Sequence, residues 1–565
     1  MSRRFLSLVV TSLCLIAIAV SPYPAQTQSA GSSRSEATTP PEVTIYLPQA
    51  HPAYGTLELL RSAGLVTDAW LNQRPLSRLV IARALLEGSR NARERGLTML
   101  AEAAEWRLRE FSRDLEPYGT SIDPGKTLLT LHWEGDHQTS ITAEPTVEFA
   151  YDARKDIPPD YASAVIARWG FELYGTAGQN IGYAARYRES FESREGSVRQ
   201  WPYSPGQTVY RTLSGFGEKS GYSESNSHVS WDGAVFGADL RFDSPSWGPS
   251  PGTNLILGGH APSFGHAQLR LKFGEWLRYT MLAGSLTSGL TDSVRSYLPE
   301  EVDIYRALKR QKYLIGHRID LRLIRNLTIG ITEAVIAGDR FPELLYFVPT
   351  ASVWDSQHYL DDPDNMMMAF DVSWSPSKGP HLYGTLGIDE WLLPETFTED
   401  SQNWVAFQLG GSWTLPIHDG RWHLWVEATR VHPNVYRHKF PVNDWIHAAS
   451  GLGFWSGMNS EVIEGQLTFL ATPRLSFSTW GRYARKGGEV TRLEQYQNPP
   501  VERFMDGADR HGAWVGGRLM YEGEQHWRLI TEIVRAPERL WPHESPPATL
   551  GQEWQFSIRW MYNPF

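Results

Sequence analysis

The chain has 565 residues with 53 basic and 63 acidic side chains, and its formal net charge at neutral pH is −10. This balance disfavours nucleic acid as a partner, because binding to phosphates requires concentrated positive charge. The chain also contains 23 Trp, 24 Tyr and 22 Phe, an aromatic content that is typical of membrane barrels with aromatic girdles at both interfaces.

The first 25 residues have the charged and apolar regions of a secretory signal peptide. Two arginines precede an apolar stretch from residue 5 to residue 20, and prolines and small residues follow it. This stretch is shorter than the roughly 20 residues that a membrane-spanning helix needs, so we predict cleavage, between residues 25 and 30. The only cysteine, Cys14, lies inside the segment. The mature chain is therefore expected to have no disulfide.

A linker and a helical region follow. Residues 26–42 are rich in Ser, Thr and Pro and indicate a flexible linker. Residues 43–118 change to the hydrophobic period of helices, with Ser77 placed to cap one helix and Gly88 to end it. Each predicted helix has one apolar stripe, so the small bundle needs a surface to pack on, and the periplasmic end of a following barrel is the candidate. The last stripe contains Leu97, Leu100, Ala101, Ala104, Leu108 and Phe111.

From residue 119 to the C-terminus the chain shows the period of two that strands have. In residues 366–374, Met366, Met368, Phe370, Val372 and Trp374 share one face, and Met367, Ala369, Asp371 and Ser373 share the other. A strand between lipid and a wet lumen must alternate in this way, because successive side chains point to opposite faces. The pattern recurs in residues 277–281, 315–323, 327–335, 382–389, 405–414 and 422–429. A soluble β-sandwich also alternates, so no single segment decides between the two folds.

The C-terminal stretch favours the membrane fold. Trp554, Phe556, Ile558, Trp560 and Tyr562 share one phase, with Gln555, Ser557 and Arg559 in the other, and the chain ends at Phe565. An alternating last strand with a terminal aromatic residue resembles the signal that outer-membrane barrels present to the barrel assembly machinery. Together with the signal peptide, it predicts an all-β transmembrane protein, an antiparallel outer-membrane β-barrel over residues 119–565.

The inferred lumen face of this barrel carries charges of both signs. Such a field can hold the lumen together through ion pairs or tune the passage of solutes, and the sequence does not separate these functions. The predicted lumen-lining residues are Arg186, Arg188, Asp239, Arg241, Arg270, Lys272, Arg278, Arg318, Asp320 and Arg322.

Catalytic motifs are missing from the chain. The sequence has no G-x-S-x-G, no H-E-x-x-H and no G-x-x-x-x-G-K-[ST]. Asp389 and Glu390 end a predicted strand near the outward mouth, but adjacent residues on a strand point to opposite faces and do not suit a glycosidase pair. We expect no catalysis, no cofactor and no metal site.

Short motifs along the mature chain occur in an order that resembles the capsule-assembly Wzi family. They are Gly64-Leu65-Val66, Trp70-Leu71-Asn72, Arg74-Pro75-Leu76-Ser77-Arg78, Trp247-Gly248-Pro249, Asn254-Leu255-Ile256-Leu257, Ala261-Pro262, Asp364-Asn365, Asp389-Glu390 and Gly451-Leu452-Gly453.

This resemblance implies an outer-membrane barrel of about 18 strands with a small periplasmic helical bundle, in a Gram-negative bacterium. It also implies a non-catalytic, lectin-like protein that anchors capsular or other extracellular polysaccharide, with outer-membrane lipid around the barrel. The alternative is a porin for small or anionic solutes. The candidate polysaccharide-binding residues are Trp247, Asn254, Phe264, Trp354, Tyr359, Asp389 and Glu390. The aromatic ones are expected in outward loops, where they could stack on sugar rings or equally anchor the barrel at the membrane interface.

Overall fold

The computed structural model describes residues 43–562 except for 68, 125–128, 136–138, 156–160, 197–206, 213–218, 392–402, 449, 489–491, 493–494, 496–503, 506–509 and 538–551. The predicted signal peptide and linker, residues 1–42, and the terminal Phe565 lie outside the described residues.

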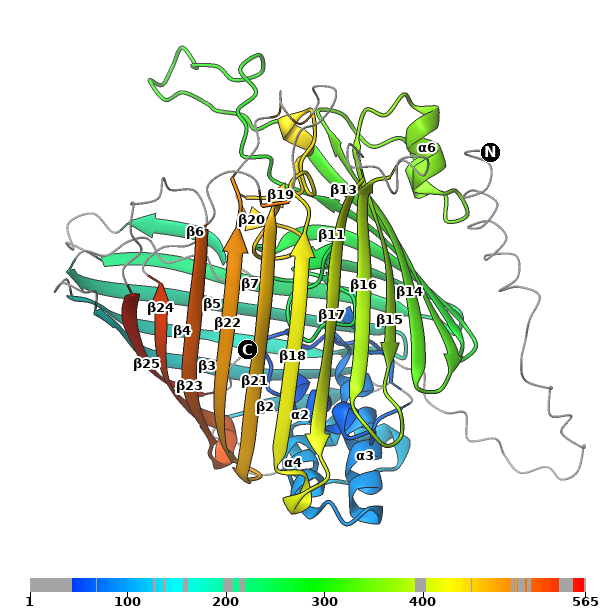
Figure 1. Ribbon diagram of the computed structural model, residues 1–565, viewed down its shortest axis with the longest axis vertical. Coiled ribbons are helices and arrows are strands. Elements are labelled where there is room, and N and C mark those ends of the chain that lie inside the picture. The colour runs from blue at the N-terminus through cyan, green and yellow to red at the C-terminus, as the bar shows by residue number, and fades with distance from the viewer. Residues whose placement is uncertain are drawn as a thin grey trace, which may run out of the picture.

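In the described part of the chain, eighteen antiparallel strands close into one barrel, which confirms the predicted fold class (Figure 1). Consecutive strands of the ring are neighbours, and β25 closes it by pairing with β3. The ring contains β3 (Thr139–Lys155), β4 (Tyr161–Ala177), β5 (Ile181–Gly196), β7 (Lys219–Asp232), β8 (Phe236–Asp243), β11 (Phe264–Phe273), β12 (Leu277–Ser285), β13 (Lys312–Ile324), β14 (Leu327–Gly338), β15 (Asn365–Trp374), β16 (His381–Glu390), β17 (Trp404–Leu415), β18 (Trp422–Val431), β21 (Ser460–Thr472), β22 (Leu475–Lys486), β23 (Arg510–Glu522), β24 (Trp527–Pro537) and β25 (Gln552–Tyr562).

Several short strands lie beside the ring or between its members. Strand β2 (Leu131–Gly135) pairs with the start of β3, and β6 (Gln207–Thr212) pairs with β7. A separate small sheet joins β1 (Gln73–Arg74) to β9 (Ser246–Trp247) and β10 (Leu257–Gly258), and β19 (Ile446–His447) pairs with β20 (Ser450–Gly451).

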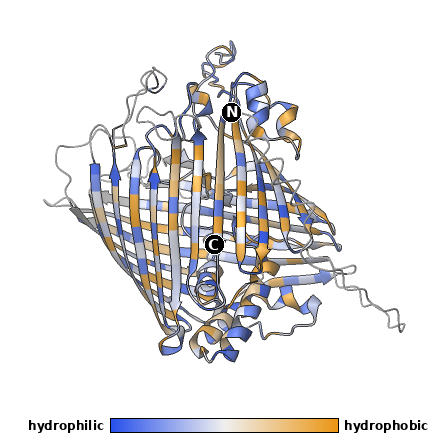
Figure 2. Cartoon of the chain, turned by 45° about the vertical axis from the view of Figure 1, so that its right-hand side comes forward, coloured by the Kyte–Doolittle hydropathy of each residue, from blue (hydrophilic) through white to orange (hydrophobic). Residues whose placement is uncertain are grey.

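Side chains alternate along the barrel strands between an apolar outer face and a polar inner face. On β17, Phe407 and Leu409 are 52% and 70% exposed, whereas Gln408 between them is buried. Figure 2 shows the same alternation of apolar and polar residues along many strands. The outer face is thus suited to lipid and the inner face to a polar lumen.

The outer face is not exposed everywhere. Met366 and Met368 are in phase with the exposed Val372 and Trp374 of β15, yet both methionines are buried. The segment between β14 and β15 folds back over them and contributes Tyr346, Val353 and Trp354 to a shared apolar cluster. This segment contains η4 (Leu344–Phe347) and α6 (Val353–Tyr359).

Helices occupy the region before the barrel: α2 (Ala53–Ser62), α3 (Arg78–Glu94), α4 (Thr98–Leu108), η1 (Arg109–Phe111), α5 (Ser112–Leu115) and η2 (Glu116–Tyr118). Ser77 caps α3, since its hydroxyl accepts a hydrogen bond from the amide of Val80 at 3.2 Å. The prediction that Gly88 ends this helix is wrong. A Cβ at Gly88 would lie 2.6 Å from Leu60 of α2, so the glycine lets two helices approach closely within a continuous α3.

These helices pack against the end of the barrel where strands are joined by short turns such as residues 325–326, opposite to α6 (Figure 1). Leu100 of α4 contacts Gly420 in the turn between β17 and β18. The side chain of Arg95 donates a hydrogen bond to the carbonyl of Ser377 in another short turn, at 2.6 Å. None of the helices in the described residues has the length and apolar character needed to cross a membrane.

Candidate functional site

The N-terminal segment of the described chain lies inside the barrel, against the inner faces of β5, β7, β8 and β11. The amide of Thr44 donates to the carboxylate of Asp232 at 2.8 Å, and the hydroxyl of Tyr46 donates to that of Asp239 at 3.0 Å. The guanidinium of Arg186 donates to the carbonyl of Tyr46 at 2.8 Å. This part of the lumen is therefore occupied by the protein's own backbone.

At the short-turn end of the barrel, helix α2 enters the lumen beside β15, β16 and β17. Arg61 donates to the hydroxyl of Ser375 at 3.1 Å, and the hydroxyl of Thr414 donates to the carbonyl of Leu59 at 2.8 Å. Glu58 lies 3.0 Å from the imidazole of His381. Burial alone would raise the pKa of Glu58, but the neighbouring charges and hydrogen bonds hold it well below its usual range. The contacts to the wall are thus polar and specific.

A third element, the segment between β8 and β11, folds inward and crosses the lumen. The hydroxyl of Ser250 donates to Glu427 of β18 at 2.6 Å, and Gln408 of β17 donates to the carbonyl of Thr253 at 2.7 Å. Arg74 donates to the carbonyl of Pro251 at 2.9 Å and so joins this segment to the N-terminal region.

The position of this segment corrects three sequence predictions. The sequence predicts Trp247 and Phe264 in outward loops and Asn254 in contact with polysaccharide, but the three side chains are buried in the lumen, with exposed fractions of 3%, 2% and 1% respectively. Trp247 belongs to the small sheet with β1, and Phe264 begins β11 and contacts the ring of His447. Asn254 accepts a hydrogen bond from the amide of Ser250 at 3.1 Å. All three hold the inward fold together instead of facing solvent.

The other predicted binding residues lie near the end of the barrel that carries the long connecting segments. Asp389 is buried and accepts a hydrogen bond from the amide of Tyr436 at 2.7 Å, so it holds the connection that follows β18. Glu390 and Trp354 are partly buried, and Trp354 packs in the cluster around α6. Tyr359, at the end of α6, is 82% exposed. Of these four, Tyr359 has the accessibility that contact with a sugar requires.

The charged residues predicted to line the lumen lie on inward-facing positions and take part in a dense set of polar contacts. Arg318 is 1% exposed and pairs with Asp320 and Asp371, both at 2.7 Å. Arg188 pairs with Glu224 at 2.6 Å. The further contacts are Arg186 with Glu172, Arg241 with Asp243, Arg270 with Asp239, and Arg278 and Arg322 with the ring of Trp70, while Lys272 lines a cavity.

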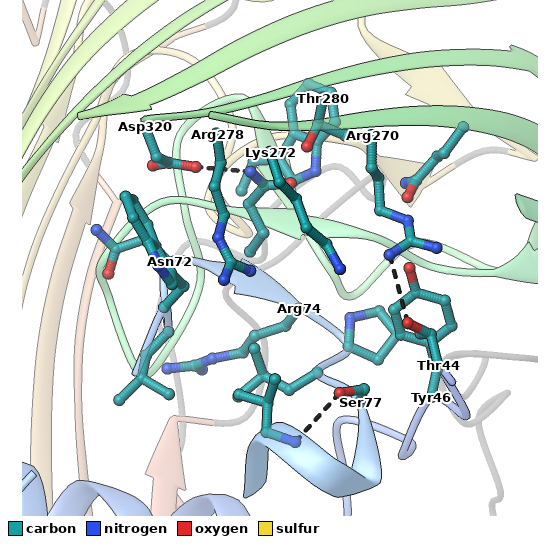
Figure 3. A pocket seen from close by; sticks show the side chains of 18 of the residues that line it. Thr44, Tyr46, Asn72, Arg74, Ser77, Arg270, Lys272, Arg278, Thr280 and Asp320 are labelled. Atoms are coloured by element: carbon teal, nitrogen blue, oxygen red, sulfur yellow. Dashed lines mark hydrogen bonds between the residues drawn. The ribbon is translucent and has the colours of Figure 1, made fainter. Parts of the chain in front are cut away.

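Cavities remain between these internal segments and the barrel wall. The cavity in Figure 3, of about 120 Å³, lies between the start of α3 and the inner faces of β11, β12 and β13. Two larger cavities, of about 400 and 450 Å³, lie beside β3, β4, β5 and β7 and beside β21, β22 and β23. Among the described residues, no group of three His, Cys, Asp or Glu side chains is placed to hold a metal ion.

Comparison with known proteins gives a structural relationship alone, since no family model and no curated protein matches the chain. The solved structure of Wzi from Escherichia coli, described as a carbohydrate-binding β-barrel involved in group 1 capsule assembly, aligns with a TM-score of 0.53 and 14% identity over 92% of this chain and 99% of that chain. OpdQ from Pseudomonas aeruginosa aligns with a TM-score of 0.42 and 8% identity, over 74% of this chain and 98% of that chain. OccK8 (OprE) from the same organism aligns with a TM-score of 0.42 and 8% identity, over 75% of this chain and 97% of that chain. At this identity the likeness to Wzi shows that the chain shares the fold of an outer-membrane β-barrel.

Proposed function

We propose that this protein belongs to the Wzi family and is a non-catalytic outer-membrane protein of a Gram-negative bacterium that binds capsular or other surface polysaccharide and holds it at the cell surface. The observation that carries the proposal is the occupied lumen. The N-terminal segment, α2 and the segment between β8 and β11 all bond to the inner wall. A barrel filled in this way is poorly suited to general diffusion, and its outward segments become the working surface.

The orientation follows from the turns. Short turns are periplasmic in outer-membrane barrels, and the helices lie at that end, so the long segments 286–311, 339–364 and 432–459 face outward. These segments carry exposed aromatic rings that can pack against the apolar faces of sugar rings. They include Tyr297, Tyr305, Phe341 and Tyr359, with exposed fractions of 47%, 55%, 64% and 82%.

A porin for small or anionic solutes is the second candidate. The two cavities of about 400 and 450 Å³ favour it, since both lie beside the internal segments and both are lined by Arg528. Steady, large channels in planar bilayers, together with no binding to the organism's own polysaccharide, would support this candidate and contradict the anchoring proposal.

The deciding experiment compares cell-attached with shed polysaccharide in a strain that lacks the chromosomal copy. Complementation with the natural chain should restore attachment. Complementation with a variant carrying Tyr297→Ala, Tyr305→Ala and Tyr359→Ala should restore less of it, with a loss on the order of 1 kcal/mol per aromatic contact. Phe407→Ala on the lipid-facing surface is the control and should behave as the natural chain. Equal attachment in all strains, including the deletion strain, would contradict the proposal.

A further inference from the structure

The outer face of the barrel carries two polar side chains at a height where lipid is expected. His317 of β13 and Glu333 of β14 are register partners, and His317 is in phase with the exposed Leu323. His317 is the eighth residue from the short-turn end of β13, and Glu333 is the seventh from that end of β14. A strand crosses the membrane with about 9–11 residues, so both side chains lie within the membrane-spanning height.

The segment between β14 and β15, residues 339–364, provides hydrogen-bond partners for both side chains. The imidazole of His317 donates a hydrogen bond to the carbonyl of Tyr346 at 2.8 Å. Glu333 accepts hydrogen bonds from the amide of Val353 at 2.9 Å and from the hydroxyl of Ser352 at 3.1 Å. Acyl chains offer no hydrogen bonds, so polar groups on a lipid-facing wall are costly unless the protein itself satisfies them. The segment therefore takes the place of lipid on this part of the wall.

The area that the segment covers extends below the outward rim of the barrel. Met368 is the seventh residue from the short-turn end of β15, and it is buried in the apolar cluster that the segment forms with the wall. Phe407 is the ninth residue from the same end of β17, and it is half exposed on the outer face. The covered residue thus lies no farther outward than a residue that another strand presents to lipid.

The covering segment is apolar on its far side as well. Residues 341–348 have the sequence FPELLYFV, in which Glu343 is the one charged residue. Tyr346 is buried against the wall, but Leu344 and Val348 are 77% and 41% exposed. Contact with sugar does not account for these two side chains, because aliphatic groups have no ring face on which a sugar can stack. A stretch that is apolar on both sides favours lipid over water as its surrounding.

The charged groups of the segment lie near the outward rim. Arg340, which follows the end of β14, pairs with Asp364, which precedes the start of β15, at 2.7 Å. Arg340 also pairs with Glu343 at 2.5 Å. These ion pairs balance charge at the level of the strand ends, whereas Tyr346 reaches His317 farther down the wall. The segment is thus polar where headgroups are expected and apolar where acyl chains are expected.

We infer that residues 341–348 are immersed in the outer leaflet and contact the acyl chains of its lipids, with Leu344 and Val348 as the principal contacts. The wall around the segment is the lipid-facing surface of the barrel, so this contact continues the lipid interface across the folded segment. The occupant of the exposed apolar side is therefore the hydrocarbon chain of a lipid. Lipid contact at this stretch does not depend on polysaccharide binding, so each can fail without the other.

Spin labels test this contact in the full chain reconstituted into vesicles of phosphatidylcholine and phosphatidylglycerol. Cys14→Ser removes the only cysteine of the chain, and Leu344→Cys or Val348→Cys then places a single nitroxide on the stretch. Oxygen collects in hydrocarbon, whereas a polar nickel chelate stays in water. The ratio of the collision rates of the label with these two reagents therefore reports whether the side chain lies in lipid or in water.

Two exposed aliphatic positions provide matched controls. Leu409→Cys places the label on the lipid-facing surface of β17, and Val294→Cys places it on the outward segment 286–311. The oxygen-to-nickel ratio at Leu344 and Val348 should be close to that at Leu409. It should exceed the ratio at Val294 by about tenfold, because a polar solute is excluded from hydrocarbon.

Two results would overturn the inference. Nickel access at either position as high as at Val294→Cys would place the stretch in water. Low access to both reagents, together with dipolar broadening of the spectra, would show that a second copy of the chain covers the surface instead of lipid. A heat-dependent shift in gel migration reports that each labelled variant is folded, and the labelled positions are exposed, so the label displaces no packed side chain.

Discussion

Gly182 of β5 lies directly against the backbone of the N-terminal segment. A Cβ at this position would lie 2.2 Å from the carbonyl oxygen of Thr44, whereas ordinary contacts of such an atom begin near 3.4 Å. The same carbonyl accepts a hydrogen bond from the hydroxyl of Ser230 on β7. Glycine in a strand often marks such a close approach of backbone, and here it allows the segment to lie on the inner wall.

Gly182→Val is therefore expected to displace the N-terminal segment while the barrel assembles. Protease added to the purified protein should cleave faster between residues 43 and 50 in this variant. Gly265→Val is the matched control, because a Cβ at Gly265 on the outer face of β11 has no neighbour within 4 Å. Equal cleavage in both variants would show that the segment does not depend on this contact.

The polar contacts of α2 predict the conductance of the barrel. The natural chain should show little steady conductance in planar bilayers, because α2 and the inward segment occupy the lumen. Glu58→Ala combined with Arg61→Ala removes contacts to β16 and to the end of β15 and should increase the conductance and its fluctuation. Arg90→Ala combined with Glu94→Ala removes an exposed base and an exposed acid from α3 and should leave the conductance unchanged. Large conductance in the natural chain would contradict the role of α2 as a plug.

The packing of α4 predicts a stability effect. Leu100 and Leu108 are 1% and 2% exposed within the apolar cluster of the bundle. Leu100→Asp and Leu108→Asp should each destabilise the bundle by about 2–4 kcal/mol, because each buries an unpaired charge. Limited proteolysis across residues 90–115 measures the effect, and Thr98→Asp at an exposed position is the control. Normal protease resistance in both leucine variants would mean that the stripe is not buried.

Glu110 predicts a dependence of bundle stability on pH. Burial raises the pKa of its carboxyl, but Arg107, His51 and His526 outweigh burial and hold that pKa well below its usual range. When the pKa of a carboxyl is lower in the folded state than in the unfolded state, its ionised form stabilises the fold at pH values above the unfolded-state pKa, which is about 4.3. This stabilisation is lost as the pH falls below that value. The bundle should thus lose protease resistance on acidification below about pH 4.

Glu110→Gln tests this assignment. The variant should be less stable than the natural chain at pH 7, and the difference between them should shrink as the pH falls toward 3. Glu102→Gln, at an exposed position on α4, provides the comparison and should follow the natural chain. An unchanged pH profile in Glu110→Gln would assign the acid sensitivity to another group.

The sequence by itself determined the barrel and the polarity of its two faces. A strand alternates its side chains with a period of two, so Phe407 and Leu409 must lie on the face opposite to Gln408 once this segment is a strand. The same local rule placed Arg318 and Asp320 on the inner face of β13. The cap at Ser77 was also predictable, because capping depends on residues within one turn of the chain.

Only the tertiary structure decided which segments fill the lumen. Trp247, Asn254 and Phe264 are buried because the segment between β8 and β11 folds inward, held by contacts such as that of Ser250 with Glu427, 177 positions away in the chain. Met366 is covered for a similar reason, since α6 folds over the outer wall. The cavity in Figure 3 likewise exists because β1 and the start of α3 lie against the inner faces of β11 and β12. Local periodicity assigns a residue to a face, but burial and charge balance depend on which distant segment comes to lie against that face.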